Sequence, residues 1–132
     1  MSVATFATHD HKPVRALWEE AFEKPHHSEQ ARHDLAKIAE FAGLPAPNQS
    51  MDYLAQFYPV IFNALFRSES WIAIVMITDL LGRKDRFNVP GTAANSNWSR
   101  RLPGTIRKLA RSPDAKRQML VVQELLQKSG RI

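Results

Sequence analysis

The sequence has 132 residues, no cysteine and a formal net charge of +5 at pH 7. This length suits one domain with a real hydrophobic core, and the lack of cysteine excludes disulfides and thiolate metal sites. We therefore expect a reducing, cytoplasmic location. No apolar run approaches the roughly 20 residues of a membrane span, and no signal-peptide pattern opens the sequence, so we expect no membrane partner.

The positive charge is concentrated near the C-terminus. Residues 98–132 carry nine Lys and Arg against two Asp and Glu, whereas residues 1–97 carry nine against eleven. A basic segment of this kind is most often a solvated helix face, and nucleic-acid binding is the alternative. Because no nucleic-acid motif is visible, we do not expect a nucleic-acid partner.

The first predicted elements are a strand over residues 2–8 and a helix over residues 13–24. The strand segment is rich in residues that favour β-structure and in small side chains. Pro13 suits the first position of a helix. His9 and Asp10 lie between them, where α/β barrels place catalytic groups. Asp10 could equally cap the helix, and spacing alone leaves both interpretations open.

Two further helices are predicted over residues 28–43 and 50–68. Ser28 can cap the first and Gly43 can end it, while Ser50 with Asp52 can open the second. Pro59 lies inside the second helix, so we expect a kink or a break there.

The stretch that follows holds the most information about function. The apolar run 71–77 predicts a strand, over 71–78, that is buried on both faces, as in a parallel sheet. A loop over 79–103 comes next, and a loop of that length is usually functional or disordered. Its polar and aromatic side chains suit hydroxyl-rich ligands such as sugars: Asp79, Asp85, Arg86, Asn88, Asn95, Asn97 and Trp98. The alternative is an irregular loop whose Asn residues make turns.

The last predicted elements are helices over 105–111 and 113–129, the second opened by Ser112 and Pro113. The order strand, helices, strand, loop, helices predicts a helix-dominated α/β fold in a single segment, residues 1–132.

Several motifs in this order resemble a known family. Residues 79–82 (DLLG), 86–92 (RFNVPGT), 97–98 (NW) and 100–103 (RRLP) are similar to the C-terminal signature of the 4-α-glucanotransferases. These enzymes are the amylomaltases, or disproportionating enzymes, of glycoside hydrolase family 77. Thr78 stands where that family usually has glutamine.

A second motif supports the same resemblance. Residues 7–10 (ATHD), followed by Pro13 and residues 18–20 (WEE), resemble the family's motif at the end of its seventh barrel strand. The resemblance implies that Asp10 is the third catalytic carboxylate, which stabilises the transition state, and that His9 bonds the same sugar. It also implies a set of substrate-binding residues, namely Asp79, Arg86, Asn88, Asn97 and Trp98.

The resemblance further implies the last quarter of a (β/α)8 TIM barrel, with two short parallel strands and four to five helices. The family moves α-1,4-glucan segments by a retaining double displacement, using a nucleophile and an acid/base from its fourth and fifth strands. Residues 1–132 contain neither, so we expect no activity from this chain alone. The implied partners are an α-1,4-glucan and a complementary N-terminal barrel chain, or another copy of the chain; no cofactor is implied.

Two alternatives remain at this point. The chain could be a standalone, non-catalytic helical module that binds glucan or protein through the Trp98 loop. The second alternative is a metal site. His9 and His11 could chelate a metal ion, and further imidazoles come from His26, His27 and His33. Zinc needs three or four convergent ligands, and nothing in the sequence enforces convergence, so we expect no metal.

Overall fold

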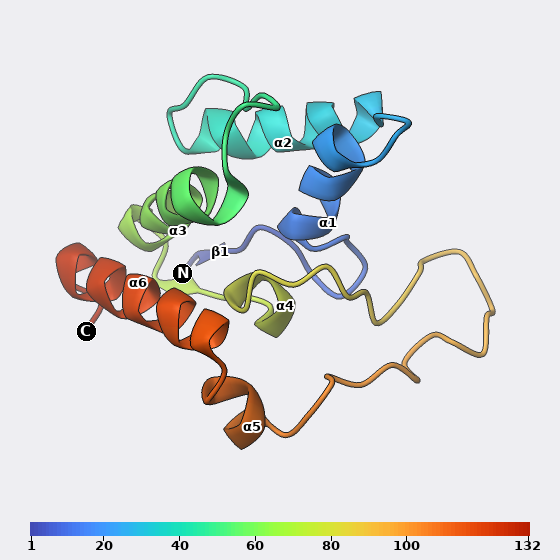
Figure 1. Ribbon diagram of the computed structural model, residues 1–132. Coiled ribbons are helices and arrows are strands. Elements are labelled where there is room, and N and C mark those ends of the chain that lie inside the picture. Colours follow the sequence, from blue (N-terminus) through green and yellow to red (C-terminus); the bar gives the residue numbers. More distant parts are fainter.

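The computed structural model describes residues 1–132, with helices arranged around a short two-stranded sheet (Figure 1). The strands β1 (Val3–Ala4) and β2 (Ile72–Ala73) are parallel, with Val3 opposite Ile72 and Ala4 opposite Ala73. The helical elements are α1 (Val14–Trp18), the π-helical η1 (Glu19–Glu23), α2 (Glu29–Phe41), the π-helical η2 (Tyr53–Phe57), α3 (Tyr58–Arg67), α4 (Ile77–Leu80), α5 (Ile106–Ala110) and α6 (Pro113–Ser129). The predicted helix-dominated fold with two parallel strands is confirmed.

Local side-chain chemistry sets several helix ends. Ser28, Asp52 and Ser112 each accept a hydrogen bond from the backbone N–H three residues later, which satisfies a donor that the helix leaves free. Gly43 follows α2 and Gly130 ends α6, both with positive φ near 70°. Helix α6 therefore has the bounds that the sequence indicates.

Two of the predicted helices are divided. The segment 13–24 becomes α1 followed by the wider turn η1, and the helix expected over 50–68 starts only at Tyr53. That second helix changes from η2 to α3 at Tyr58, next to Pro59. Proline has no N–H and its ring crowds the preceding turn, so the break falls where the sequence indicates it.

The predicted strands 2–8 and 71–78 were too long. The strand pairing covers only two residues on each side, and Ile72 and Ile74 donate ladder hydrogen bonds to Ser2 and Ala4 respectively. After Val75 the chain turns into α4, so residues 77–80 are helical and the predicted loop begins only at residue 81.

The expectation of burial on both sheet faces was also wrong. Successive strand residues point to opposite faces. Ala4, Phe6, Ala73 and Val75 pack against the helical core, whereas Val3 and Ile74 are each 51% exposed on the other face. The sheet of this chain is thus covered by helices on one side and open on the other.

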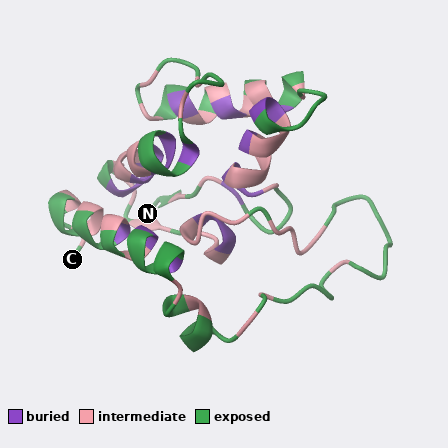
Figure 2. Cartoon of the chain, in the orientation of Figure 1, coloured by how far each residue is buried: buried purple, intermediate pink, exposed green.

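The core lies between the helices and is rich in aromatic rings (Figure 2). Phe62 is fully buried in α3 and contacts the rings of Phe6, Tyr58 and Phe66. Trp18 of α1 forms a second cluster with Phe22, Tyr53 and Phe57 on η1 and η2.

Arg131 ties the C-terminus to the turn before β2. Its guanidinium donates hydrogen bonds to four main-chain carbonyls, those of Phe66, Ser68, Ser70 and Trp71. These bonds hold the turn that connects α3 to the sheet, and the rigid fork of the guanidinium suits several acceptors at once.

We predict that Arg131→Ala lowers the free energy of unfolding by about 1–3 kcal/mol, because four carbonyls lose a charged donor. Arg131→Lys should recover only part of the loss, since one ammonium group cannot reach all four acceptors. Urea denaturation followed by circular dichroism measures both variants. Arg107→Ala, at an exposed position of α5, is the control and should change little. Equal effects of the Arg107 and Arg131 variants would contradict the prediction.

Candidate functional site

Two connections meet beside the sheet and α1. The first connection, residues 5–13, joins β1 to α1, and the second connection, residues 81–105, joins α4 to α5 and extends beyond the helices (Figure 1). Asn88 Nδ2 donates to Asp10 Oδ1 at 2.7 Å, and Arg86 Nη2 donates to the Asp10 carbonyl at 2.8 Å. Predicted site residues nearly 80 positions apart are therefore in direct contact.

His9 and Trp98 extend this cluster. Their ring centroids are 5.0 Å apart with the planes inclined at 50°, and His9 Nε2 is 3.4 Å from Asp10 Oδ1. Trp98 is 64% exposed and has a φ of 63°, the single positive φ outside glycine. Its backbone N–H donates to the Phe87 carbonyl at 2.7 Å. The exposed Trp98 ring therefore contacts His9, and His9 lies beside the Asp10 carboxylate that Asn88 contacts, a set of groups that suits a sugar ring.

Asn97 serves the loop itself. Its Oδ1 accepts from the Val89 N–H at 3.0 Å, and its Nδ2 donates to the carbonyl and the hydroxyl of Thr92, also at 3.0 Å. The turn interpretation thus describes the contacts of Asn97, and its predicted contact with substrate remains a prediction.

Asp79 lines a small cavity together with His9 and Arg86, but its hydrogen bond is to the backbone of α1. It is 1% exposed in α4, and its Oδ1 accepts from the Val14 N–H at 2.8 Å. Asp79, and not Asp10, therefore accepts the free N–H at the start of α1. Pro13, at the N-cap position, has no side chain that could cap the helix. The predicted contact of Asp79 with sugar remains untested, and in this structure its carboxylate has a protein partner. The neighbouring Thr78 hydroxyl is buried without a partner.

Burial changes the acidity of this region. Loss of solvation raises the pKa of Asp79 from 3.8 to about 6, although the Val14 N–H lowers it. Burial and the Asp79 charge both raise the pKa values of Tyr53 and Tyr58 above 10, so both phenols stay neutral at physiological pH. Tyr58 Oη donates to the Leu80 carbonyl at 2.7 Å.

The raised pKa of Asp79 predicts a pH dependence of stability. The folded state holds this proton more tightly than the unfolded state, so the contribution of Asp79 is complete below about pH 4 and is lost as the pH rises through about 6. The difference amounts to about 3 kcal/mol. We expect Asp79→Asn to become more stable relative to wild type by about that amount between pH 4 and pH 7. Urea titrations at several pH values test this, and Asp52→Asn, at an exposed cap, should show no such trend.

The family model of the 4-alpha-glucanotransferases matches residues 1–107. The chain belongs to this family. The resemblance drawn from the motifs is therefore confirmed, and with it a relation to transferases of carbohydrate metabolism. The match includes both connections, ends at the second residue of α5 and leaves α6 outside. A search of curated proteins found no matching sequence.

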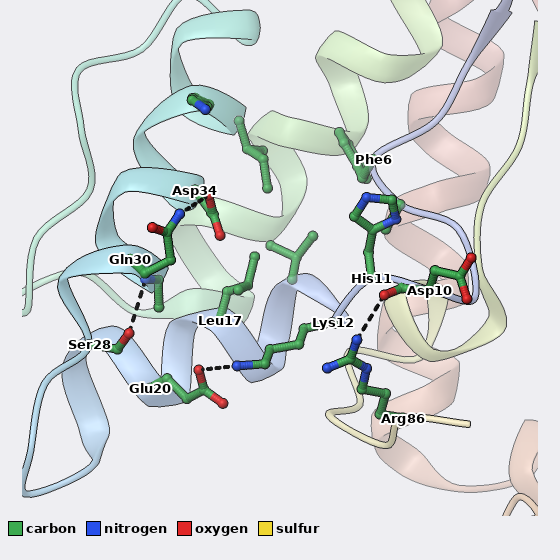
Figure 3. Close-up of a pocket in the computed structure, with 15 residues that line it drawn as sticks. Phe6, Asp10, His11, Lys12, Leu17, Glu20, Ser28, Gln30, Asp34 and Arg86 are labelled. Atoms are coloured by element: carbon green, nitrogen blue, oxygen red, sulfur yellow. Dashed lines mark hydrogen bonds and ion pairs between the residues drawn. The ribbon is translucent and has the colours of Figure 1, made fainter. Parts of the chain in front are cut away.

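A cleft of about 440 Å³ adjoins this candidate site between the first connection and α2 (Figure 3). Asp10, His11 and Arg86 lie on one side, and Gln30 and Asp34 lie on the other. Lys12 and Glu20 form an ion pair of 2.7 Å at one end. Sequence analysis missed the lining residues of α2, because their face is set by packing between helices and no motif marks it.

Two further features of this member of the 4-alpha-glucanotransferase family concern metal ions and membranes. No group of three His, Asp or Glu side chains lies close enough to hold a metal ion, and His11 Nδ1 lies 3.0 Å from the Thr8 hydroxyl within the same turn. No helix has the length and apolar character that crossing a bilayer requires.

Proposed function

We propose that these 132 residues form the C-terminal part of a 4-α-glucanotransferase and supply one side of its glucan site. The observation that carries the proposal is the 2.7 Å contact between Asn88 and Asp10, which joins the two connections that the family match includes. Asp10 would accept hydrogen bonds from glucose hydroxyls, with Asn88 and Arg86 holding its carboxylate and main chain. His9 and Trp98 would offer a second polar contact and a ring for stacking.

The proposed reaction requires two carboxyl groups that this chain does not supply. Retaining glycoside chemistry uses a nucleophile and a general acid/base about 5 Å apart. The aspartates of α4 and of the second connection already have protein partners, Asp79 the Val14 N–H and Asp85 the Arg83 side chain at 2.6 Å. Asp10 is therefore proposed to stabilise the transition state, and the covalent step would depend on carboxylates of a complementary chain.

The sheet supports the same proposal. Its open face exposes Val3 and Ile74, and a second cleft of about 400 Å³ runs beside β1, with Phe41 among its lining residues. A (β/α)8 barrel has eight parallel strands and a packed interior, so six further strand–helix units would cover this apolar face. We propose that these units are the chain's partner, and that self-association through the same face competes when they are absent.

Complementation tests this proposal. The chain is mixed with a polypeptide carrying the six preceding strand–helix units of a family member, and release of glucose and longer glucans from maltotriose is measured. We expect neither chain to be active alone and the mixture to transfer glucan segments. A mixture that forms a stable complex without transfer, or this chain transferring glucan by itself, would overturn the proposal.

A binding module without catalysis is the second candidate, favoured by the exposed ring of Trp98. If the chain binds maltooligosaccharides alone, Trp98→Ala should weaken binding about tenfold, because stacking on one aromatic face contributes roughly 1 kcal/mol or slightly more. Isothermal titration calorimetry measures the affinity. Trp71→Ala is the matched control, since Trp71 is 68% exposed directly before β2, and it should bind as wild type does. Equal losses in both variants would argue against a Trp98 site.

A further inference from the structure

We propose that Asp79 is a positioning residue that fixes Asp10 against the second connection, in place of the sugar contact predicted for it. The inference rests on the proposed function, because the residue being positioned is the proposed catalytic carboxylate. Its basis is the buried hydrogen bond from the Val14 N–H to Asp79 Oδ1, which links residues 65 positions apart.

The start of α1 has no cap of its own. Pro13 occupies the N-cap position, no side chain caps the helix locally, and the first turn has no acidic residue. A free N–H at a buried helix start needs an acceptor. Val14 is 1% exposed, and Asp79 supplies that acceptor from α4.

The hydrogen bond between Val14 and Asp79 joins the end of the first connection to the helix that precedes the second connection. Asp10 lies four residues before Val14, and the φ of the intervening Pro13 is restricted by its ring. The second connection starts at residue 81, directly after α4. Arg86 and Asn88 also reach Asp10, but their bonds are exposed to water, which competes for such groups. The contact of Asp79 with Val14 is the buried link among the three.

The helix that carries Asp79 is itself anchored. Tyr58 of α3 donates to the Leu80 carbonyl, and Gly82 follows with a φ of 60°. A Cβ at Gly82 would lie 2.8 Å from the side chain of Leu54, so the chain passes close to η2 here. Asp79 therefore connects the first connection to the rigid core and not merely to another loop.

Nuclear magnetic resonance of the isotope-labelled chain tests the positioning role. In Asp79→Ala we expect at least tenfold faster amide exchange at Val14, and a shift of the Asn88 side-chain NH2 resonance toward its position in an unfolded chain. Asp79→Asn keeps a carbonyl acceptor and should restore both signals. Asp52→Ala removes a comparable cap, accepted from the Ala55 N–H at the start of η2, and should leave both signals unchanged.

The role is overturned if Asp79→Ala folds and leaves the Asn88 side-chain resonance where wild type has it, or if Asp52→Ala moves that resonance equally. Should Asp79→Ala fail to fold, Asp79→Leu is measured instead, because it keeps the volume and removes the acceptor. The readout needs neither glucan nor activity, so its failure is distinguishable from failure of the complementation experiment. In the complemented enzyme, Asp79→Ala should lower kcat at least tenfold with little change in KM. Asp79→Asn should recover most of that loss.

Discussion

Asp10→Asn should lower the rate of glucan transfer by the complemented enzyme about 1,000-fold. The amide keeps the size of the side chain and can still contact Asn88, but it loses the negative charge that is proposed to favour the transition state. Hydrogen bonds to sugar hydroxyls that strengthen in the transition state contribute several kcal/mol, and about 4 kcal/mol corresponds to this factor. The measurement is kcat for release of glucose from maltotriose by the complex.

The matched control is Asp114→Asn, an exposed carboxylate on α6 outside the family match. It should leave kcat unchanged. A complex with Asp10→Asn that retains more than a tenth of the wild-type rate would exclude the proposed role of Asp10. Loss of activity in Asp85→Asn with retention in Asp10→Asn would instead place the essential carboxylate on the second connection.

Phe62→Ala should lower the free energy of unfolding by about 3–5 kcal/mol. The ring is fully buried and contacts Phe6 before α1 as well as two rings of its own helix, so its loss leaves a cavity where the first connection meets α3. A domain of this size has a total stability of only about 5–15 kcal/mol, so the variant should be partly unfolded near physiological temperature. Urea denaturation followed by circular dichroism gives the difference.

Phe41→Ala makes the same substitution at a position that is 54% exposed on α2, and it should change the stability of the isolated chain by less than about 0.5 kcal/mol. Phe41 lines the cleft beside β1, so this variant should instead weaken association with the complementary chain. A stability loss at Phe41 as large as at Phe62 would show that α2 packs differently in solution.

The fold was predictable where local chemistry decides it. Ser28, Ser112 and Gly130 mark helix ends in the sequence, because a cap needs only residues within one turn. The strands were predicted too long, because an apolar run does not tell how many neighbouring strands are present. The same alternation that packs Ala73 of β2 inward leaves Ile74, the next residue, exposed, and only the three-dimensional arrangement reveals that one face is open.

Only part of the candidate site could be predicted from the sequence, and the roles given to its residues stay predictions. Spacing alone left Asp10 undecided between a cap and a catalytic group, and the family resemblance was needed to group it with residues of the second connection. The contact of Asp10 with Asn88 agrees with that grouping. The partner of Asp79 could not be foreseen, since a hydrogen bond to Val14 depends on how α4 packs against α1.

The backbone of Trp98 has a consequence for protein engineering. A bulky residue with a φ of 63° is rare, because its side chain crowds its own main chain, whereas glycine adopts this conformation freely. Trp98→Gly should therefore make the chain more resistant to unfolding while removing the ring that is proposed to stack on a sugar. Variants selected for thermal stability alone would accumulate glycine at this position. A library screened for stability therefore needs a simultaneous screen for glucan affinity.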